Sequence, residues 1–265
     1  MSRGTRIQTA WRFTKGISKA FQRGEWLPDL VRDAAPGAPG GSTETLPSGS
    51  VLQRLGKELD WFTHSSHVVP LEGLERPLRL LHLTDVHIRR KNRRLMTLCD
   101  RVSEFQCDGV MLTGDVVAKG WEEEAVSLFL EALPDAPLGR FAVMGNWEHW
   151  GGAPAEVWEP LLARHDVRLL RDESLDLGPL HLAGTEDLLS ATPDVEKALA
   201  GLPKDRQSIV LTHSPGLFPQ IARREVGLVL SGHSHGGQFR LPGVGALFVP
   251  RATGAYVAGW YEQDG

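Results

Sequence analysis

The chain has 265 residues, of which 41% are hydrophobic and 23% are charged, and this balance excludes a largely disordered protein. Its formal net charge is −4, from 29 basic and 33 acidic residues, so the overall charge gives no reason to expect a nucleic-acid partner. No apolar run reaches the roughly 18 residues that a membrane-spanning helix needs, no secretory signal is recognisable, and two cysteines are too few for a disulfide framework, so we expect a cytoplasmic protein.

Residues 1–33 form a basic amino-terminal segment, whose first 24 residues carry six cations and no acid. Wound as a helix, this segment would place a stripe of arginines and lysines opposite apolar residues that include Trp11 and Phe21. That pattern is typical of a helix lying in a membrane interface, which predicts peripheral contact with the inner face of the membrane through residues 1–24. The alternative is a helix that packs on its own domain and leaves its charges in water.

Residues 34–50 contain the run Pro-Gly-Ala-Pro-Gly-Gly-Ser, a composition that predicts a flexible linker. We therefore expect the folded catalytic body to occupy residues 51–265. Within it, apolar runs alternate with stretches of helical spacing. Strands are predicted at 67–70, 78–83, 109–113, 141–144, 167–170, 180–183, 208–212 and 228–231, and helices at 51–62, 92–105, 121–133, 155–165 and 194–200. Buried strands that alternate with helices indicate a layered α/β domain.

Five of the predicted strands end at side chains that can bind a metal ion. In open α/β sheets ligands bind beyond the carboxyl ends of the strands, so these side chains would meet at one edge. Each of them alone has an ordinary explanation as a turn or cap residue. Coincidence at all five strand ends is much harder to accept. The residues are Asp85 and His87, then Asp115, then Asn146, then His213, then His233 and His235.

This set combines carboxylates, imidazoles and one amide, and it contains no thiolate, which argues against a structural zinc site. Seven ligands are too many for one transition metal, but they suit two ions about 4 Å apart that share a carboxylate. Such a pair neutralises phosphoryl oxygens and lowers the pKa of a bridging water to make hydroxide. The residues therefore predict hydrolysis of a phosphate ester.

The order of the motifs resembles that of the calcineurin-like metallophosphoesterase superfamily. The matching motifs are Asp85-Val86-His87, Gly114-Asp115, Gly145-Asn146, His213 and Gly232-His233-Ser234-His235. The continuation through Gly236-Gly237-Gln238 is similar to one bacterial branch, the YkuE-like phosphoesterases. The resemblance implies an α/β fold with a four-layer α/β/β/α sandwich, and a dinuclear centre of two divalent metal ions drawn from Mn, Fe, Zn or Mg.

The resemblance also implies which residues bind each ion. The first ion would be bound by Asp85, His87, Asp115 and His235. The second ion would be bound by Asp115, Asn146, His213 and His233. In the mechanism implied, a hydroxide that bridges the ions attacks phosphorus while Asn146 and the ions hold the phosphoryl oxygens.

The chain departs from the family pattern at Trp147, where the family usually has a histidine that protonates the leaving group. Tryptophan cannot do acid–base work. His149 lies two residues further on and would take over the role only if the segment is extended, because alternate residues of an extended segment point the same way. The other interpretation of His149 is a surface histidine. Loss of a general acid typically costs about 10²–10⁴-fold, and it matters least for a diphosphate bond or an aryl ester.

The second departure is the end of the chain. Residues 256–262 resemble a strand after which the family usually continues with further sheet, whereas this sequence stops at Gly265. We therefore expect either a truncated chain or a second sheet that is short of strands.

The predicted function is a dinuclear metal-dependent phosphohydrolase, acting as a phosphomonoesterase, phosphodiesterase or pyrophosphohydrolase. The substrate would be a phosphorylated small molecule or a lipid-linked compound such as UDP-2,3-diacylglucosamine, which the basic amino-terminal segment would suit. The alternative is a catalytically weak metal-binding interaction module, because of Trp147. A serine hydrolase that uses Ser214 or Ser234 is the weakest option, since neither serine lies in a Gly-x-Ser-x-Gly elbow.

Overall fold

The computed structural model describes residues 5–12, 41–42, 62–71, 73–202, 208–224, 226–236, 239–241 and 245–262. The helix predicted at 51–62 lies outside the described residues apart from Phe62. The same holds for the linker predicted at 34–50 apart from residues 41–42, and for the amino-terminal segment apart from residues 5–12.

The larger of the two main sheets has eight strands in the order β2-β4-β1-β5-β6-β7-β8, with β3 paired to β1. Its parallel core consists of β1 (Thr5–Arg12), β5 (Arg79–Thr84), β6 (Gly109–Thr113), β7 (Gly139–Val143) and β8 (Val167–Leu169). The antiparallel strands at its other side are β2 (Gly41–Ser42), β3 (Thr63–His64) and β4 (Ser66–Val69). The core of this sheet contains four of the strands predicted from apolar runs.

The second sheet has the strand order β12-β11-β10-β9. β10 (His181–Gly184), β11 (Ser208–Leu211) and β12 (Leu228–Leu230) are parallel, and β9 (Glu173–Asp176) is antiparallel to β10. A separate pair of short strands, β13 (Phe239–Leu241) and β14 (Gly245–Phe248), forms a hairpin-like sheet of its own. The sequence did not predict β9, β13 or β14.

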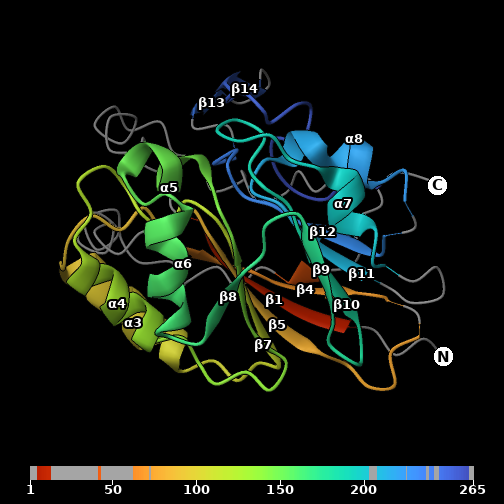
Figure 1. Ribbon diagram of the computed structural model, residues 1–265, viewed down its shortest axis with the longest axis horizontal. Helices are drawn as coiled ribbons and strands as arrows, with labels where there is room; N and C mark the ends of the chain where they lie inside the picture. The colour runs from red at the N-terminus through yellow and green to blue at the C-terminus, as the bar shows by residue number, and fades with distance from the viewer. Residues whose placement is uncertain are drawn as a thin grey trace.

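Helices lie on the outer faces of both sheets (Figure 1). The large sheet is covered by α3 (Arg93–Ser103), α4 (Glu123–Glu131) and α6 (Ala155–Ala163). The second sheet is covered by α7 (Val195–Leu199), the 3₁₀ turn η2 (Pro215–Leu217) and α8 (Phe218–Ile221). A further short helix, α5 (Asn146–Gly151), follows β7 directly. Among the described residues, no helix is both long and apolar enough to cross a bilayer.

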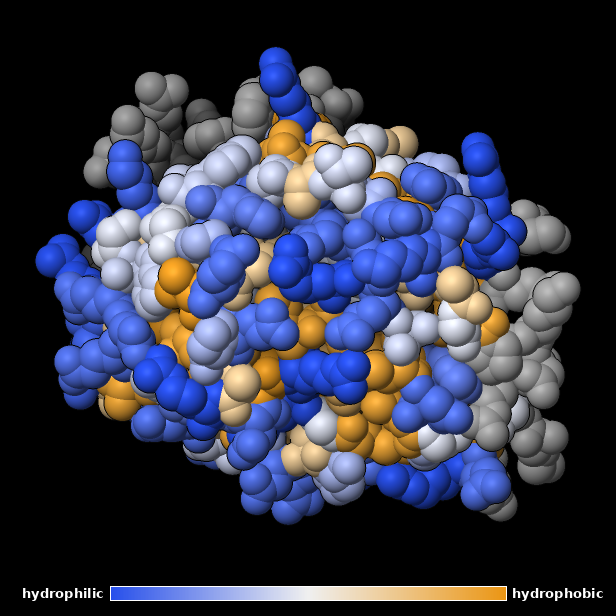
Figure 2. Space-filling model, in the orientation of Figure 1, coloured by the Kyte–Doolittle hydropathy of each residue, from blue (hydrophilic) through white to orange (hydrophobic). Residues whose placement is uncertain are grey.

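Period-two alternation along the strands divides the core into layers. In β5, Leu81 packs toward the helices of the large sheet, whereas Leu80 packs against the second sheet. In β11, Ile209 faces the large sheet and Val210 faces α7 and α8. The layers therefore follow the order helices, sheet, sheet, helices, which confirms the predicted α/β/β/α sandwich. Figure 2 shows that hydrophilic residues cover most of one face of this sandwich, with apolar residues in separate patches between them.

The amphipathic helix predicted for the amino-terminal segment is wrong for residues 5–12, which form β1. This strand pairs in parallel with β5, from Arg6 opposite Arg79 to Arg12 opposite Thr84. β-Branched residues at positions 5, 7 and 9 favour a strand. Pairing with β5 is a stronger reason for the strand. Without β1, the backbone N–H and C=O groups on that edge of β5 would lack partners, and a helix could not supply them.

The strand predicted at 256–262 is also wrong. The Tyr261 hydroxyl accepts the backbone N–H groups of Val257 and Ala258 at 3.0 and 3.3 Å, and Gly259 has a left-handed backbone with φ of 90°. The segment therefore turns back on itself. Local hydrogen bonds of this kind compete with sheet pairing, and an apolar pattern alone does not reveal them.

Candidate metal centre

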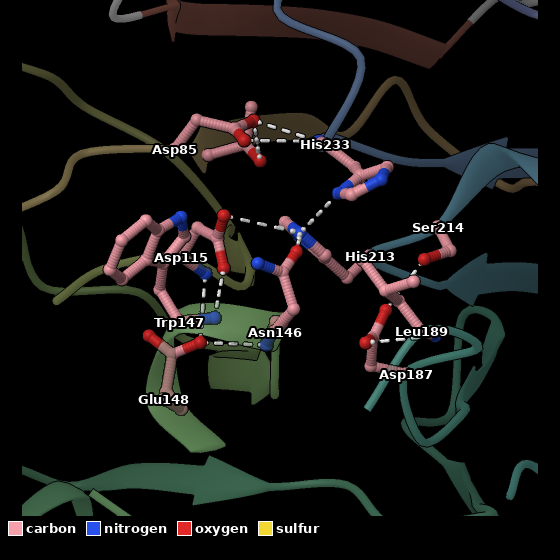
Figure 3. A network of polar contacts seen from close by, with 12 residues as sticks. Asp85, Asp115, Asn146, Trp147, Glu148, Asp187, Leu189, His213, Ser214 and His233 are labelled. Carbon is pink, nitrogen blue, oxygen red and sulfur yellow. Dashed lines mark hydrogen bonds and ion pairs between the residues drawn. The ribbon is translucent and has the colours of Figure 1, made fainter. Parts of the chain in front are cut away.

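The polar strand-end residues meet at one edge of the sandwich, beyond the carboxyl ends of parallel strands from both sheets (Figure 3). Asp85 follows β5 directly, Asp115 comes two residues after β6 ends, and Asn146 begins α5 after β7. His213 follows β11, and His233 follows β12. The loops after five strands thus bring these side chains together, as the positions of the apolar runs predict.

Four residues form a first donor group, namely Asp85, His87, Asp115 and His235, whose ligand atoms all lie within 4.8 Å of one another. His235 Nε2 is 3.3 Å from Asp85 Oδ1 and 3.2 Å from His87 Nε2. The His87 and His235 rings stack with centroids 5.1 Å apart. Asp115 Oδ2 completes the group at 3.8 Å from His87 Nε2.

A second donor group consists of Asp115, His213 and His233, again with ligand atoms within 4.8 Å of one another. His213 Nε2 is 3.4 Å from Asp115 Oδ2 and 3.2 Å from His233 Nδ1. Asn146 Oδ1 adjoins the group, 3.2 Å from His213 Nε2. The same oxygen of Asp115 therefore faces both donor groups, as expected of a shared ligand.

Backbone carbonyls orient two of these imidazoles. His213 Nδ1 lies 2.7 Å from the carbonyl oxygen of Thr113, and His233 Nε2 lies 2.5 Å from that of Arg251. A carbonyl only accepts hydrogen bonds, so these two nitrogens are the protonated ones. The opposite nitrogens, His213 Nε2 and His233 Nδ1, face the site, where a metal ion would bind their lone pairs once His213 has lost its second proton.

The backbone adopts an unfavourable conformation at most of these positions. Five of the donor residues have a positive φ, which costs energy for any side chain other than glycine. They are Asp85 (55°), His87 (53°), Asp115 (54°), His233 (66°) and His235 (46°). At Gly232 a Cβ would collide with the Thr84 hydroxyl, so glycine permits the close approach of the last loop to the first. Strain concentrated on one set of polar residues is a mark of a functional site.

Two buried carboxylates and the imidazoles around them dominate the electrostatics of the centre. Burial raises the pKa of Asp85, but the imidazoles of His235, His213 and His87 outweigh it and lower this pKa to about 2. Burial lowers the pKa of His213, yet Asp115 and then Asp85 reverse the effect and raise it to about 10. The carboxylates thus favour positive charge at the centre, which is the property of a site that attracts cations.

The donor set fits divalent metal ions. Ligand bonds of about 2.0–2.2 Å at tetrahedral or octahedral angles place neighbouring ligand atoms roughly 2.8–3.6 Å apart. The separations of 3.2, 3.3 and 3.4 Å within the two groups fall in this range, and the 3.8 Å between His87 Nε2 and Asp115 Oδ2 lies just above it. Buried carboxylate and imidazole donors without thiolate suit catalytic metals such as Mn, Fe, Zn or Mg.

Glu148 is a buried residue of this site that the sequence analysis missed. Its carboxylate accepts backbone N–H groups of Asp115, Val116 and Val117 on one side and of Gly145 on the other, at 2.7–3.2 Å. Burial and the neighbouring Asp115 raise the pKa of Glu148 to about 7. The side chain therefore joins the loop of Asp115 to the loop of Asn146. Its only signal in the sequence was its place next to the motif.

A second supporting contact lies behind His213. Asp187, fully buried, accepts a hydrogen bond of 2.6 Å from the Ser214 hydroxyl, and its other oxygen accepts the backbone N–H groups of Leu189 and Ser190. The serine next to His213 is thus held by the loop that follows β10. Ser214 is engaged as a donor to Asp187, which argues against its use as a nucleophile.

The structure separates Trp147 from His149. Residues 146–151 form α5 rather than an extended segment, so residues two apart point to different sides of a helix. Trp147 lies against the first donor group, with its ring centroid 6.0 Å from that of His87, and its backbone N–H donates to Asp115 Oδ1 at 2.8 Å. His149 is not among the clustered donors of the described residues. The extended segment on which its catalytic role depended is therefore not formed.

Comparison with known proteins agrees with the motif order. The family described as calcineurin-like phosphoesterase matches residues 78–237. The chain is 31% identical over 176 residues to the uncharacterized metallophosphoesterase YkuE of Bacillus subtilis, covering 63% of this chain and 61% of the relative. It is 29% identical over 203 residues to an uncharacterized metallophosphoesterase of Campylobacter jejuni, covering 73% and 52%. A Helicobacter pylori relative with the same description is 30% identical over 208 residues, covering 74% and 53%.

The chain spans only part of the length of these relatives, between 52% and 61% of the first two. The matched family region begins one residue before β5 and ends just after His235, so it contains every candidate ligand.

Proposed function

The chain belongs to the calcineurin-like phosphoesterase family, and we propose that it is a dinuclear metal-dependent phosphohydrolase. Its reaction would be the hydrolysis of a phosphate ester or a diphosphate bond. The observation that carries this proposal is the pair of adjacent donor groups that share one oxygen of Asp115. A single structural ion would need neither the second group nor the shared carboxylate.

In this proposal the first donor group holds one divalent cation, and the second donor group with Asn146 holds the other. Two cations bound there would supply positive charge to the phosphoryl oxygens and acidify water at the centre. The identity of the metal is open among Mn, Fe, Zn and Mg, since carboxylate and imidazole donors accept all four.

The protein's own groups would orient the centre and control access to it. The backbone N–H of Trp147 holds one oxygen of Asp115 and leaves the other facing both donor groups. Thr113 and Arg251 hold His213 and His233 through their carbonyls. The donor side chains are buried, His87 at 7% and His235 at 8% exposed, whereas the neighbouring Trp147 is half-buried, so substrate would approach from the side of Trp147.

In this proposal, no side chain among the described residues at the centre takes the place of the usual leaving-group acid. Indole does not exchange protons near neutral pH, and α5 turns His149 away from Trp147. The proposal therefore favours substrates whose leaving group departs without protonation, such as an aryl ester or a diphosphate. Whether His149 acts at all is tested directly by the variant His149→Ala, for which we expect unchanged activity.

The test combines metal analysis with hydrolysis of nitrophenyl phosphate and bis(nitrophenyl) phosphate in the presence of Mn²⁺. The variant Asp115→Ala should lower both metal content and kcat/KM, the latter by more than about 100-fold, because even indirect support of a ligand is typically worth 10–100-fold. Val68→Ala, an exposed residue on β4, serves as the control that keeps both. Full activity of Asp115→Ala would overturn the two-metal proposal.

A second candidate function is a metal-binding interaction module with little catalysis, and the observation that favours it is Trp147 in place of an acid. The same assay separates the two functions. If the wild-type protein binds Mn²⁺ but hydrolyses neither nitrophenyl substrate, the module is favoured and the enzyme is not.

A lipid-linked substrate such as UDP-2,3-diacylglucosamine, with peripheral membrane contact through residues 1–24, stays a prediction. This prediction was based on an amphipathic helix over residues 1–24, but residues 5–12 form the strand β1. Co-sedimentation with anionic liposomes would test the contact by comparing the wild-type protein with a variant in which Lys15, Lys19 and Arg23 are changed to Gln, which keeps β1. Equal pelleting of the two forms would rule it out.

A further inference from the structure

Two tryptophans lie side by side next to the candidate centre. Trp147 and Trp150 are three residues apart on α5, a spacing that places both side chains on the same face of a helix. Their ring centroids are 6.0 Å apart and their planes meet at 71°, an edge-to-face contact. Neither indole ring is among the metal-binding groups, and no step of the proposed hydrolysis uses the two rings.

The pair runs from the donor groups out to solvent. At its inner end, the Trp147 ring meets the His87 ring edge to face, with centroids 6.0 Å apart and planes at 88°. Figure 3 shows the Trp147 indole beside the Asp115 carboxylate. At its outer end, Trp150 is 54% exposed, which makes it the most exposed large apolar side chain among those described.

The core does not account for this arrangement. The other close tryptophan pair of the described chain, Trp121 with Trp158, lies against the main core, where Trp158 is completely buried. By contrast, Trp147 is half-buried and Trp150 is exposed, so their apolar area contributes little to folding. The backbone N–H of Trp147 donates to Asp115, which places this residue next to the shared carboxylate, and its ring contacts those of His87 and Trp150. A partly exposed aromatic surface thus lies next to the donor groups.

We propose that Trp147 and Trp150 form an aromatic platform that binds an aromatic group esterified to the substrate phosphate. This inference rests on the proposed phosphohydrolase function and adds a substrate class to it. Trp147 stands where the family usually has the acid that protonates the leaving group. Its ring would instead stack on an aromatic leaving group, which departs without protonation.

The reaction balances without a protein acid. The oxygen of water bonds to phosphorus and that water loses a proton to solvent. The bond between phosphorus and the aryl oxygen breaks, and the electron pair departs with a phenolate that takes up a proton from solvent. Stacking of aromatic rings is worth about 0.5–1.5 kcal/mol beyond area burial, so a platform should favour an aromatic group about 3- to 10-fold.

Binding of phosphonates tests the platform without catalysis, because their carbon–phosphorus bond is not hydrolysed. Titration calorimetry of the Mn²⁺-loaded protein would compare phenylphosphonate with methylphosphonate. We expect the wild-type protein to bind the phenyl compound about 3- to 10-fold more tightly. Trp147→Leu should remove most of this preference, whereas Trp147→Phe should keep most of it.

Trp150→Leu is the second variant, since an exposed side chain can be replaced without loss of the fold. It should reduce the preference by a smaller factor, and Val68→Ala should not change it. Equal affinity of the wild-type protein for the two phosphonates, or an unchanged preference in both leucine variants, would overturn the platform and leave the phosphohydrolase in place. Failure of both phosphonates to bind would count against the proposed function, and the platform would fall with it.

Discussion

The two ends of the large sheet differ in how their charged side chains are paired and buried. At the amino ends of β5 and β6, Arg76 pairs with Asp108 at 2.8 Å, and Asp108 also accepts the backbone N–H of Arg79. At the carboxyl ends of the same strands, Asp85 and Asp115 are buried. The interactions found for those two carboxylates are with imidazoles, backbone N–H groups and a hydroxyl, without a lysine or arginine.

The difference distinguishes structural charges from functional ones. At the amino end, Arg76 and Asp108 compensate each other's charge, and the arginine is exposed to water. The carboxyl end places unfavourable backbone angles and buried carboxylates together and leaves the compensation to histidines, which are also metal ligands. A site that is costly for the free chain but suited to cations indicates selection for function rather than stability.

The first test of this difference between the two ends is a substitution of Glu148, for which we expect the largest effect on stability and metal affinity. Glu148→Gln replaces a carboxylate that accepts four backbone N–H groups with an amide that cannot accept them all. We expect a stability loss of about 1–3 kcal/mol and a 10–100-fold fall in Mn²⁺ affinity, as the loops of Asp115 and Asn146 separate. Chemical denaturation and metal titration would measure the two effects.

Glu131→Gln is the matched control, because Glu131 is exposed at the end of α4. It should change neither quantity. Wild-type metal affinity in Glu148→Gln would show that the two loops hold their positions without this carboxylate.

A smaller effect concerns His82, which lies in β5 on the way to the carboxyl end. Burial lowers its pKa to about 4, against the raising influence of Asp85, and its Nε2 lies 2.7 Å from the Thr113 hydroxyl. The folded state therefore holds this ring neutral, while the unfolded chain protonates it near pH 6.5. The contribution is present above pH 6.5 and is lost as the pH falls from there toward 4, with a slope of at most about 1.4 kcal/mol per pH unit.

Urea denaturation between pH 7 and 4 would check the sign. The variant His82→Leu removes the titrating group, so its stability should depend less on pH over this window than that of the wild-type protein. Identical pH profiles of the two proteins would mean that His82 does not titrate differently on folding.

The smallest effect is expected at the amino end. Arg76→Ala breaks an ion pair that is exposed to water, and such pairs are usually worth little. We expect no measurable change in melting temperature, metal content or nitrophenyl phosphatase activity. A loss of activity in this variant would contradict the division of the sheet into a structural end and a functional end.

Much of the fold was predictable because it depends on local patterns. The apolar runs at 109–113 and 208–212 became β6 and β11 almost to the residue, and both ended at candidate ligands as expected. The elements that were missed lack such patterns. Strand β9 is only partly buried along its length, and α5 follows directly from a motif that resembled a loop.

The candidate site was predictable to a similar depth. The seven donor residues of the sequence prediction are the ones that the structure brings together. Their supports were not predictable. Besides Gly145, Glu148 accepts backbone N–H groups that lie 31–33 residues away, and Asp187 accepts the hydroxyl of Ser214, which lies 27 residues away. Contacts of this kind depend on how loops meet, which no residue spacing encodes.

The sequence by itself determined which residues end the strands and what chemistry their side chains can perform, because strand periodicity and ligand type are local properties. Only the tertiary structure decided that His149 turns away from Trp147, that residues 5–12 join the large sheet, and that Trp147 and Trp150 form one exposed surface. Each of these depends on a backbone choice between helix and strand. That choice is made by packing and by unpaired sheet edges rather than by the segment alone.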